Sequence, residues 1–112
     1  MIDAQYKDRS SLRPILAAIL DALPAIGPVT VQARKTYISL VSPRHTFAVV
    51  QPTTKTRVDL GLRLDGQKPG GRLLAAKSLG TELITLRIGL SSPRDFDREA
   101  VRLLKRAYDG SL

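Results

Sequence analysis

The chain has 112 residues, 43% of them hydrophobic, and a formal net charge of +8. This length suits one domain, residues 1–112, and the apolar content is enough for a core, which argues against disorder. The absence of cysteine excludes disulfides and thiolate chemistry. Because we find no signal-peptide pattern and no apolar run long enough for a membrane span, we expect a cytoplasmic location and no membrane.

The first predicted element is a helix over residues 10–23. Apolar residues recur there at spacings of three and four, which puts them on one face of a helix. We expect Asp8, Ser10 or Ser11 to cap its start and Pro24 to end it. The apolar stripe is wide enough for this helix to form part of the core.

Two short strands are predicted next, over residues 29–34 and 37–41, because apolar and polar side chains alternate in both. Ser42-Pro43-Arg44-His45 reads as a turn with proline at its second position. If this turn closes a hairpin, Leu40 faces Phe47 and Ile38 faces Val49.

The clearest strand signal lies in residues 57–64, where every second residue is apolar: Val58, Leu60, Leu62 and Leu64. This period of two buries one face of a strand and leaves the other polar. Pro52 lacks an N–H group and is expected to end the strand before it.

The second half begins with an irregular connection, residues 65–80, rich in glycine. Residues 84–90 alternate again and predict the last strand, with Ile84 on the core face. A second helix is predicted over residues 93–108, with Ser92 as its cap and Asp95 as the carboxylate of a capping box.

These elements predict an α+β fold: one domain, with an antiparallel sheet of four or five strands and an N-terminal and a C-terminal helix packed on one face. The other face of the sheet is then open or only partly covered. Most of the net charge belongs to the sheet region, because residues 30–90 contain ten basic and three acidic residues. Such an excess favours an anionic partner.

Six residues are the candidate ligand-binding set on and around this open face: Tyr37, Lys35, Arg57, Asp59, Arg63 and Arg87. Arginine suits the place because its fork can grip phosphate or carboxylate with two hydrogen bonds. The structural interpretation of Asp59, which we favour, is an aspartate paired with Arg57, Arg63 or Arg87. The functional one is a carboxylate that orients a ligand or acts as a base.

No residue pattern predicts a catalytic, metal or cofactor site. His45 is the only histidine, and no carboxylate close to it in sequence could orient it. The Gly-rich run Lys68–Arg72 could cradle a phosphate, but it leads into no clear helix and reads as a flexible loop.

The best function from sequence is therefore a non-catalytic basic domain that binds nucleic acid or another polyanion through the open face. The alternatives are a small-molecule-binding domain or weak enzyme that uses the same face, and a protein-interaction module. Aromatic residues discriminate among them, because single-strand binders stack bases on aromatic side chains and only Tyr37 is suitably placed here.

Several motifs also resemble a bacterial family of small stand-alone or C-terminal domains catalogued as a domain of unknown function. They are Lys35-Thr36-Tyr37, Phe47-Ala48, Val58-Asp59-Leu60-Gly61-Leu62 and Ala107-Tyr108. The resemblance covers nearly the whole chain and implies one domain. It implies no activity.

Overall fold

The computed structural model describes residues 2–76 and 83–112. Within these ranges six antiparallel strands form one sheet in the order β1-β2-β3-β4-β6-β5. The strands are β1 Thr30–Ala33, β2 Ile38–Val41, β3 Thr46–Gln51, β4 Val58–Leu62, β5 Leu74–Ala75 and β6 Leu86–Leu90. The α-helices are α1 Ile2–Gln5, α2 Arg13–Ile26 and α3 Arg98–Gly110. The α+β class and the antiparallel sheet are confirmed, although four or five strands were expected.

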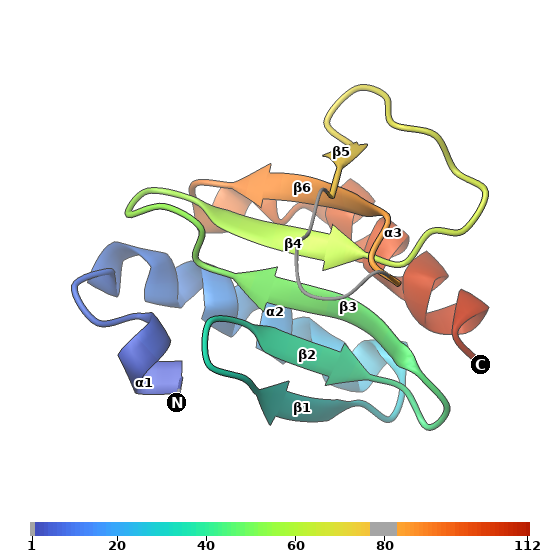
Figure 1. Ribbon diagram of the computed structural model, residues 1–112, viewed down its shortest axis with the longest axis horizontal. Helices are drawn as coiled ribbons and strands as arrows, with labels where there is room; N and C mark the ends of the chain where they lie inside the picture. Colours follow the sequence, from blue (N-terminus) through green and yellow to red (C-terminus); the bar gives the residue numbers. More distant parts are fainter. Residues whose placement is uncertain (1, 77–82) are drawn as a thin grey trace.

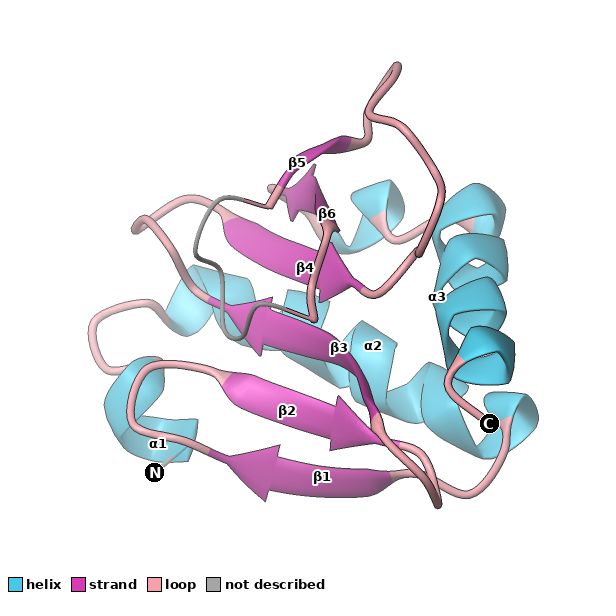
Figure 2. Ribbon diagram, turned by 45° about the vertical axis from the view of Figure 1, so that its right-hand side comes forward, coloured by secondary structure: helices cyan, strands magenta, loops and turns pink. Residues whose placement is uncertain are grey.

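The sheet forms one layer, and α2 and α3 lie behind it in Figure 1. Figure 2 shows the same layer turned, with α2 behind the strands and α3 beside them. Apolar side chains from both helices and from the strands form one buried core, which includes Ile19, Leu104, Leu40, Leu60 and Ile88. None of the helices in residues 2–76 and 83–112 has the length and apolar content that crossing a lipid bilayer requires.

The central strand β4 is buried on both of its faces, so the face that was expected to be open or only partly covered is not open at its centre. Val58, Leu60 and Leu62 belong to the main core. Asp59 and Gly61 alternate with them and are buried as well. A second, smaller apolar cluster holds Val49, Ala76 and Ile84, with Tyr37 packed against it. The centre of the second face is therefore covered.

The predicted register of the β2–β3 hairpin is wrong by one residue. Ile38 pairs with Val50 and Leu40 with Ala48, and the register shifts between Leu40 and Val41. The shift is a bulge, in which one strand carries an extra residue. Phe47 is the extra residue in β3, and it stays in the main core.

The last strand begins at Leu86 rather than at Ile84 because the Thr85 side chain enters the ladder. Leu64 N donates to Thr85 Oγ1 at 3.1 Å, and Thr85 N donates to the Leu62 carbonyl at 3.1 Å. The prediction placed the side chain of Ile84 in the main core. It lies instead in the second cluster.

The start and end of α2 also differ from the prediction. A 3-10 turn, Ser10–Leu12, precedes the helix, and no side chain caps either element. Pro24 lies inside the last turn, where its missing N–H removes one helical hydrogen bond. The helix ends at Ile26, and the residue that follows and caps it, Gly27, has φ 152°. A Cβ at Gly27 would lie 2.6 Å from the Tyr108 hydroxyl oxygen, so only glycine fits there.

The capping box of Ser92 and Asp95 is confirmed, but it closes a 3-10 turn, Pro93–Asp95. Phe96 leaves the helical region, with φ −84° and ψ 68°. Asp97 then caps α3 by accepting a hydrogen bond from Ala100 N at 3.0 Å. The helix therefore begins at Arg98, five residues later than predicted.

Candidate anion-binding site

Asp59 is the centre of a cluster of polar side chains on the second face of the sheet, the face opposite the main core. Arg57 Nε and Arg87 Nη1 lie 3.1 Å and 3.3 Å from Asp59 Oδ1. Thr53 Oγ1 donates to Asp59 Oδ2 at 2.7 Å. We call Thr53, Arg57, Asp59 and Arg87 the Asp59 cluster. Asp59 is only 2% exposed and its carboxylate faces two guanidinium groups, so its geometry is that of a structural ion pair.

The neighbouring strand leaves room for this cluster. Gly89 on β6 pairs with Asp59 on β4. A Cβ at Gly89 would lie 3.0 Å from Arg57 Cδ, which is tighter than ordinary van der Waals contact. The absent side chain at Gly89 lets Arg57 lie across the sheet, with 38% of its side chain exposed.

The six predicted ligand-binding residues do not form one cluster. Arg57, Asp59 and Arg87 meet in the Asp59 cluster. Arg63 lies beyond the other end of β4, where its Nε pairs with Asp65 Oδ2 at 3.2 Å. Tyr37 is half-buried against the second apolar cluster. Lys35 is exposed in the connection between β1 and β2.

A cavity of about 290 Å³ lies near Lys35, where α1 meets the β1–β2 and β3–β4 connections. These segments come together at the left of Figure 1. The cavity is lined by Ala4, Gln5, Arg9, Lys35, Thr36, Gln51, Pro52 and Thr53. We call it the α1 cavity. Since Thr53 also binds Asp59, the α1 cavity adjoins the Asp59 cluster.

Gln5 attaches α1 to the sheet and forms one wall of the α1 cavity. Its Nε2 donates to the carbonyl oxygens of Arg34 at 2.6 Å and Tyr37 at 2.9 Å. Arg9 Nη1 donates to the Gln5 carbonyl at 2.9 Å. Gln5 Oε1 and Arg9 Nε are buried, and no partner for either lies in the described part of the chain. Both residues line the α1 cavity, so its wall holds one acceptor and one cationic donor without a partner among the described residues.

The charge around the α1 cavity is positive. Among the described residues its lining includes Arg9 and Lys35 and no carboxylate. Between Asp21 and Asp59 the sequence has no acidic residue and five basic ones. Four of the five precede β2 or β4 and so lie at this end of the sheet: Arg34, Lys35, Lys55 and Arg57.

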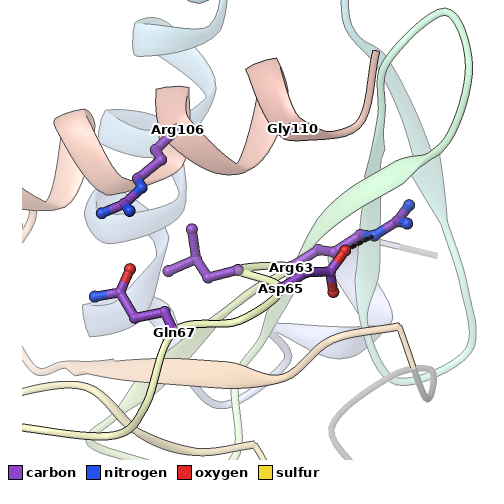
Figure 3. A pocket seen from close by; sticks show the side chains of 6 residues that line it. Arg63, Asp65, Gln67, Arg106 and Gly110 are labelled. Atoms are coloured by element: carbon purple, nitrogen blue, oxygen red, sulfur yellow. Dashed lines mark hydrogen bonds and ion pairs between the residues drawn. The ribbon is translucent and has the colours of Figure 1, made fainter.

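A second cavity, of about 180 Å³, lies between α3 and the segment that follows β4. In Figure 3 the side chain of Arg106 reaches into it from α3, while Arg63 turns toward Asp65. Gln67 forms another part of the wall. Because Asp65 balances Arg63, this cavity carries less positive charge than the α1 cavity.

The Gly-rich connection is tied to α3. Arg72 Nη1 donates to both carboxylate oxygens of Asp97 at 2.9 Å, and Arg72 Nη2 donates to the Asp95 carbonyl at 2.6 Å. The hydrogen bond from Ala100 N holds the pKa of Asp97 below its usual value, and the hydrogen bond and the charge of Arg72 each lower this pKa by a smaller amount. Arg72 is thereby committed to the fold, which disfavours a phosphate cradle there. Residues 77–80 of this connection lie outside the described residues.

His45 lies far from the α1 cavity, in the turn between β2 and β3 at the opposite end of the sheet. Its Nδ1 is 2.7 Å from the carbonyl oxygen of Ser111, so it contacts the C-terminal end of the chain. Among residues 2–76 and 83–112, no three His, Asp or Glu side chains gather in a way that could hold a metal ion.

Sequence reasoning missed the α1 cavity because it depends on α1. Its four residues carry no apolar periodicity, and Gln5 stands in a polar run with no motif around it. The one available signal was the basic character of the segments at 34–35 and 55–57. That signal was attributed to the sheet face instead of to the end of the sheet.

Fold and site together define a small α+β domain with a cationic cavity at one end of an antiparallel sheet. The chain belongs to the family described as "Domain of unknown function (DUF5655)", whose model matches residues 2–111. The resemblance to a family of unknown function is thus confirmed over nearly the whole chain. Comparisons with curated proteins and with solved structures returned no match.

Proposed function

We propose that this domain is a non-catalytic binding module for an anionic partner, with nucleic acid as the first candidate. Contact is made at the end of the sheet that carries the α1 cavity, and not on the sheet face. The observation that carries the proposal is the charge of this end: Lys35, Lys55 and Arg57 lie beside a cavity whose wall, as far as the structure describes it, includes Arg9 and no carboxylate. A cytoplasmic location, expected from the lack of cysteine, fits such a partner.

Phosphate is the group that these residues suit best. Lysine and arginine supply most of the affinity for nucleic-acid backbones, and each contact releases a condensed counterion. Asp59 holds Arg57 in place without cancelling its charge, since Arg87 shares the same carboxylate. A guanidinium fixed in this way loses little side-chain entropy when it binds.

The mode of binding follows from the scarcity of aromatic side chains. Tyr37 packs against Val49 and the rest of the second cluster, so its ring is not a free platform for a base. Phosphate contacts position a nucleic acid but carry no sequence information. We therefore expect weak sequence preference and a steep dependence on salt.

The test is a fluorescence-anisotropy titration of labelled single- and double-stranded nucleic acid at several salt concentrations. Lys35→Ala and Lys55→Ala should each lower the slope of log affinity against log salt by about one unit. Arg44→Ala is the matched control, because Arg44 is an exposed cation in the turn at the opposite end. The proposal fails if the parent does not bind at low salt, or if Arg44→Ala has the same effect as the two lysine variants.

A small-molecule ligand is the second candidate function. It is favoured by two buried atoms of residues that line the α1 cavity, Gln5 Oε1 and Arg9 Nε, for which the described residues offer no partner. A site that must satisfy one acceptor and one donor selects a compact polar ligand. The same titration distinguishes the two, since a small-molecule site gives no polymer binding with a salt-dependent slope.

A further inference from the structure

We propose that the α1 cavity binds a nucleoside monophosphate group, either free or at the 5′-phosphorylated end of a single strand. The inference rests on the proposed function and names the part of the nucleic acid that enters the cavity. It depends on the size of the cavity and on two buried polar atoms in its wall.

The size restricts the occupant. About 290 Å³ is available, close to the lower end of the usual range for ligand sites, ~300–1,000 Å³. A double helix cannot enter a space of this size, whereas one small polar group can. The rest of a strand would then leave past Thr53 toward Lys55 and Arg57.

One side of the cavity suits a phosphate. Arg9 Nη1 is occupied by the Gln5 carbonyl, which fixes the guanidinium, and the buried Nε has no acceptor in the part of the chain that the structure describes. Lys35 is exposed at the cavity, and no partner for it lies in the described ranges. A terminal phosphate offers more charge and more acceptor oxygens than a phosphodiester inside a strand.

The part of the cavity wall formed by Gln5 needs a hydrogen-bond donor from the ligand. Gln5 is 5% exposed, and both of its bonds to the Arg34 and Tyr37 carbonyls use Nε2, so Oε1 is left without a partner among residues 2–76 and 83–112. A fully ionised phosphate has no hydrogen to donate, but a nucleoside has hydroxyl and N–H groups. A ligand with phosphate at one end and such a donor beside it satisfies both walls.

The experiment compares two single strands of one sequence, one with a 5′-phosphate and one with a 5′-hydroxyl, by competition anisotropy, with adenosine monophosphate and inorganic phosphate as further competitors. We expect the phosphorylated strand to bind at least about tenfold more tightly, as one charge-assisted hydrogen bond allows. We also expect adenosine monophosphate to compete better than inorganic phosphate.

The preference should disappear in Arg9→Lys, which keeps the charge but removes the Nε donor, and in Lys35→Ala. It should persist in the matched control Arg44→Lys. If Arg9→Lys does not fold, Lys35→Ala still decides, because that side chain is exposed. Equal affinity for both strands, a preference that survives Lys35→Ala, or inorganic phosphate competing as well as the nucleotide overturns the inference.

The two proposals fail in different ways. If strands bind with a salt-dependent slope but show no preference for a 5′-phosphate, the inference is wrong and the proposed function stands. If strands do not bind at all while adenosine monophosphate binds and Lys35→Ala abolishes that binding, nucleic-acid binding is wrong and the cavity is a site for the free nucleotide.

Discussion

Thr53 donates its hydroxyl to Asp59 Oδ2 across 2.7 Å and at the same time lines the cavity formed by Gln5 and Arg9. The bond joins the segment after β3 to the middle of the sheet. It therefore holds in place the connection that carries Lys55 and Arg57. The buried carboxylate of Asp59 thus supports the shape of a neighbouring site and holds Arg57, one of the cations of the proposed binding surface, in place.

Asp59→Asn should destabilise the fold. The substitution leaves Arg57 and Arg87 without their shared carboxylate in a largely buried place, which we expect to cost about 1–3 kcal/mol of the free energy of unfolding. Urea denaturation measures it. The control is Asp65→Asn, because Asp65 pairs with Arg63 but has 65% of its side chain exposed, and it should stay within about 0.5 kcal/mol. Equal costs for the two variants would mean that the Asp59 cluster is not structural.

Leu60→Ala should cost about 2–5 kcal/mol, the range for a leucine in a close-packed core. Leu60 lies on β4, the strand between β3 and β6. It is fully buried and belongs to the main core. Leu74, on β5, is 46% exposed and offers a matched control, for which Leu74→Ala should cost less than about 0.5 kcal/mol. Urea unfolding curves for both variants check the difference. A cost below about 1 kcal/mol for Leu60→Ala would mean that Leu60 does not lie in a close-packed core.

Tyr6→Phe should change how stability depends on alkaline pH. Burial raises the pKa of Tyr6 from 10.0 to about 12, although Arg9 and Arg13 act in the opposite direction. The unfolded chain therefore loses this proton first, and the free energy of unfolding falls as the pH rises from 10 to 12. In Tyr6→Phe this part of the fall should be absent. Unfolding in urea at several alkaline pH values compares the two proteins, and identical slopes would contradict the burial of the hydroxyl.

His45→Ala should leave binding unchanged. His45 lies at the end of the sheet opposite the α1 cavity, and its side chain forms a hydrogen bond across the fold to the Ser111 carbonyl at 2.7 Å. Loss of that hydrogen bond should lower the free energy of unfolding by about 0.5–1.5 kcal/mol. A folded His45→Ala variant that no longer binds the partner would show that the site is misplaced.

The sequence predicts well those features that depend on local periodicity. Residues 58–62 are a strand because alternation in one segment is enough to specify it, and the box of Ser92 and Asp95 forms because its members are three residues apart. The capping-box pattern did not predict that Phe96 leaves the helical conformation before Asp97 caps α3. Two competing caps within one short segment give the same residue pattern as one longer helix.

Features that depend on contacts between distant segments were missed. The bulge at Leu40 depends on how the turn packs, and the burial of Asp59 depends on strands and connections on both sides of it. A polar residue that alternates with apolar ones looks the same in sequence whether water or a pair of arginines covers it. For that reason the centre of the sheet face, which is covered, was expected to be accessible, although the excess of positive charge in this region is real.

The most direct test of the central proposal is an amide NMR titration of the isotope-labelled protein with a 5′-phosphorylated single strand at low salt. We expect the shift changes to concentrate at residues 4–9, 34–37 and 51–57, which surround the α1 cavity, and to vanish at high salt. Changes that concentrate on α3 and around Arg106, or no changes at all, would contradict binding at this end of the sheet.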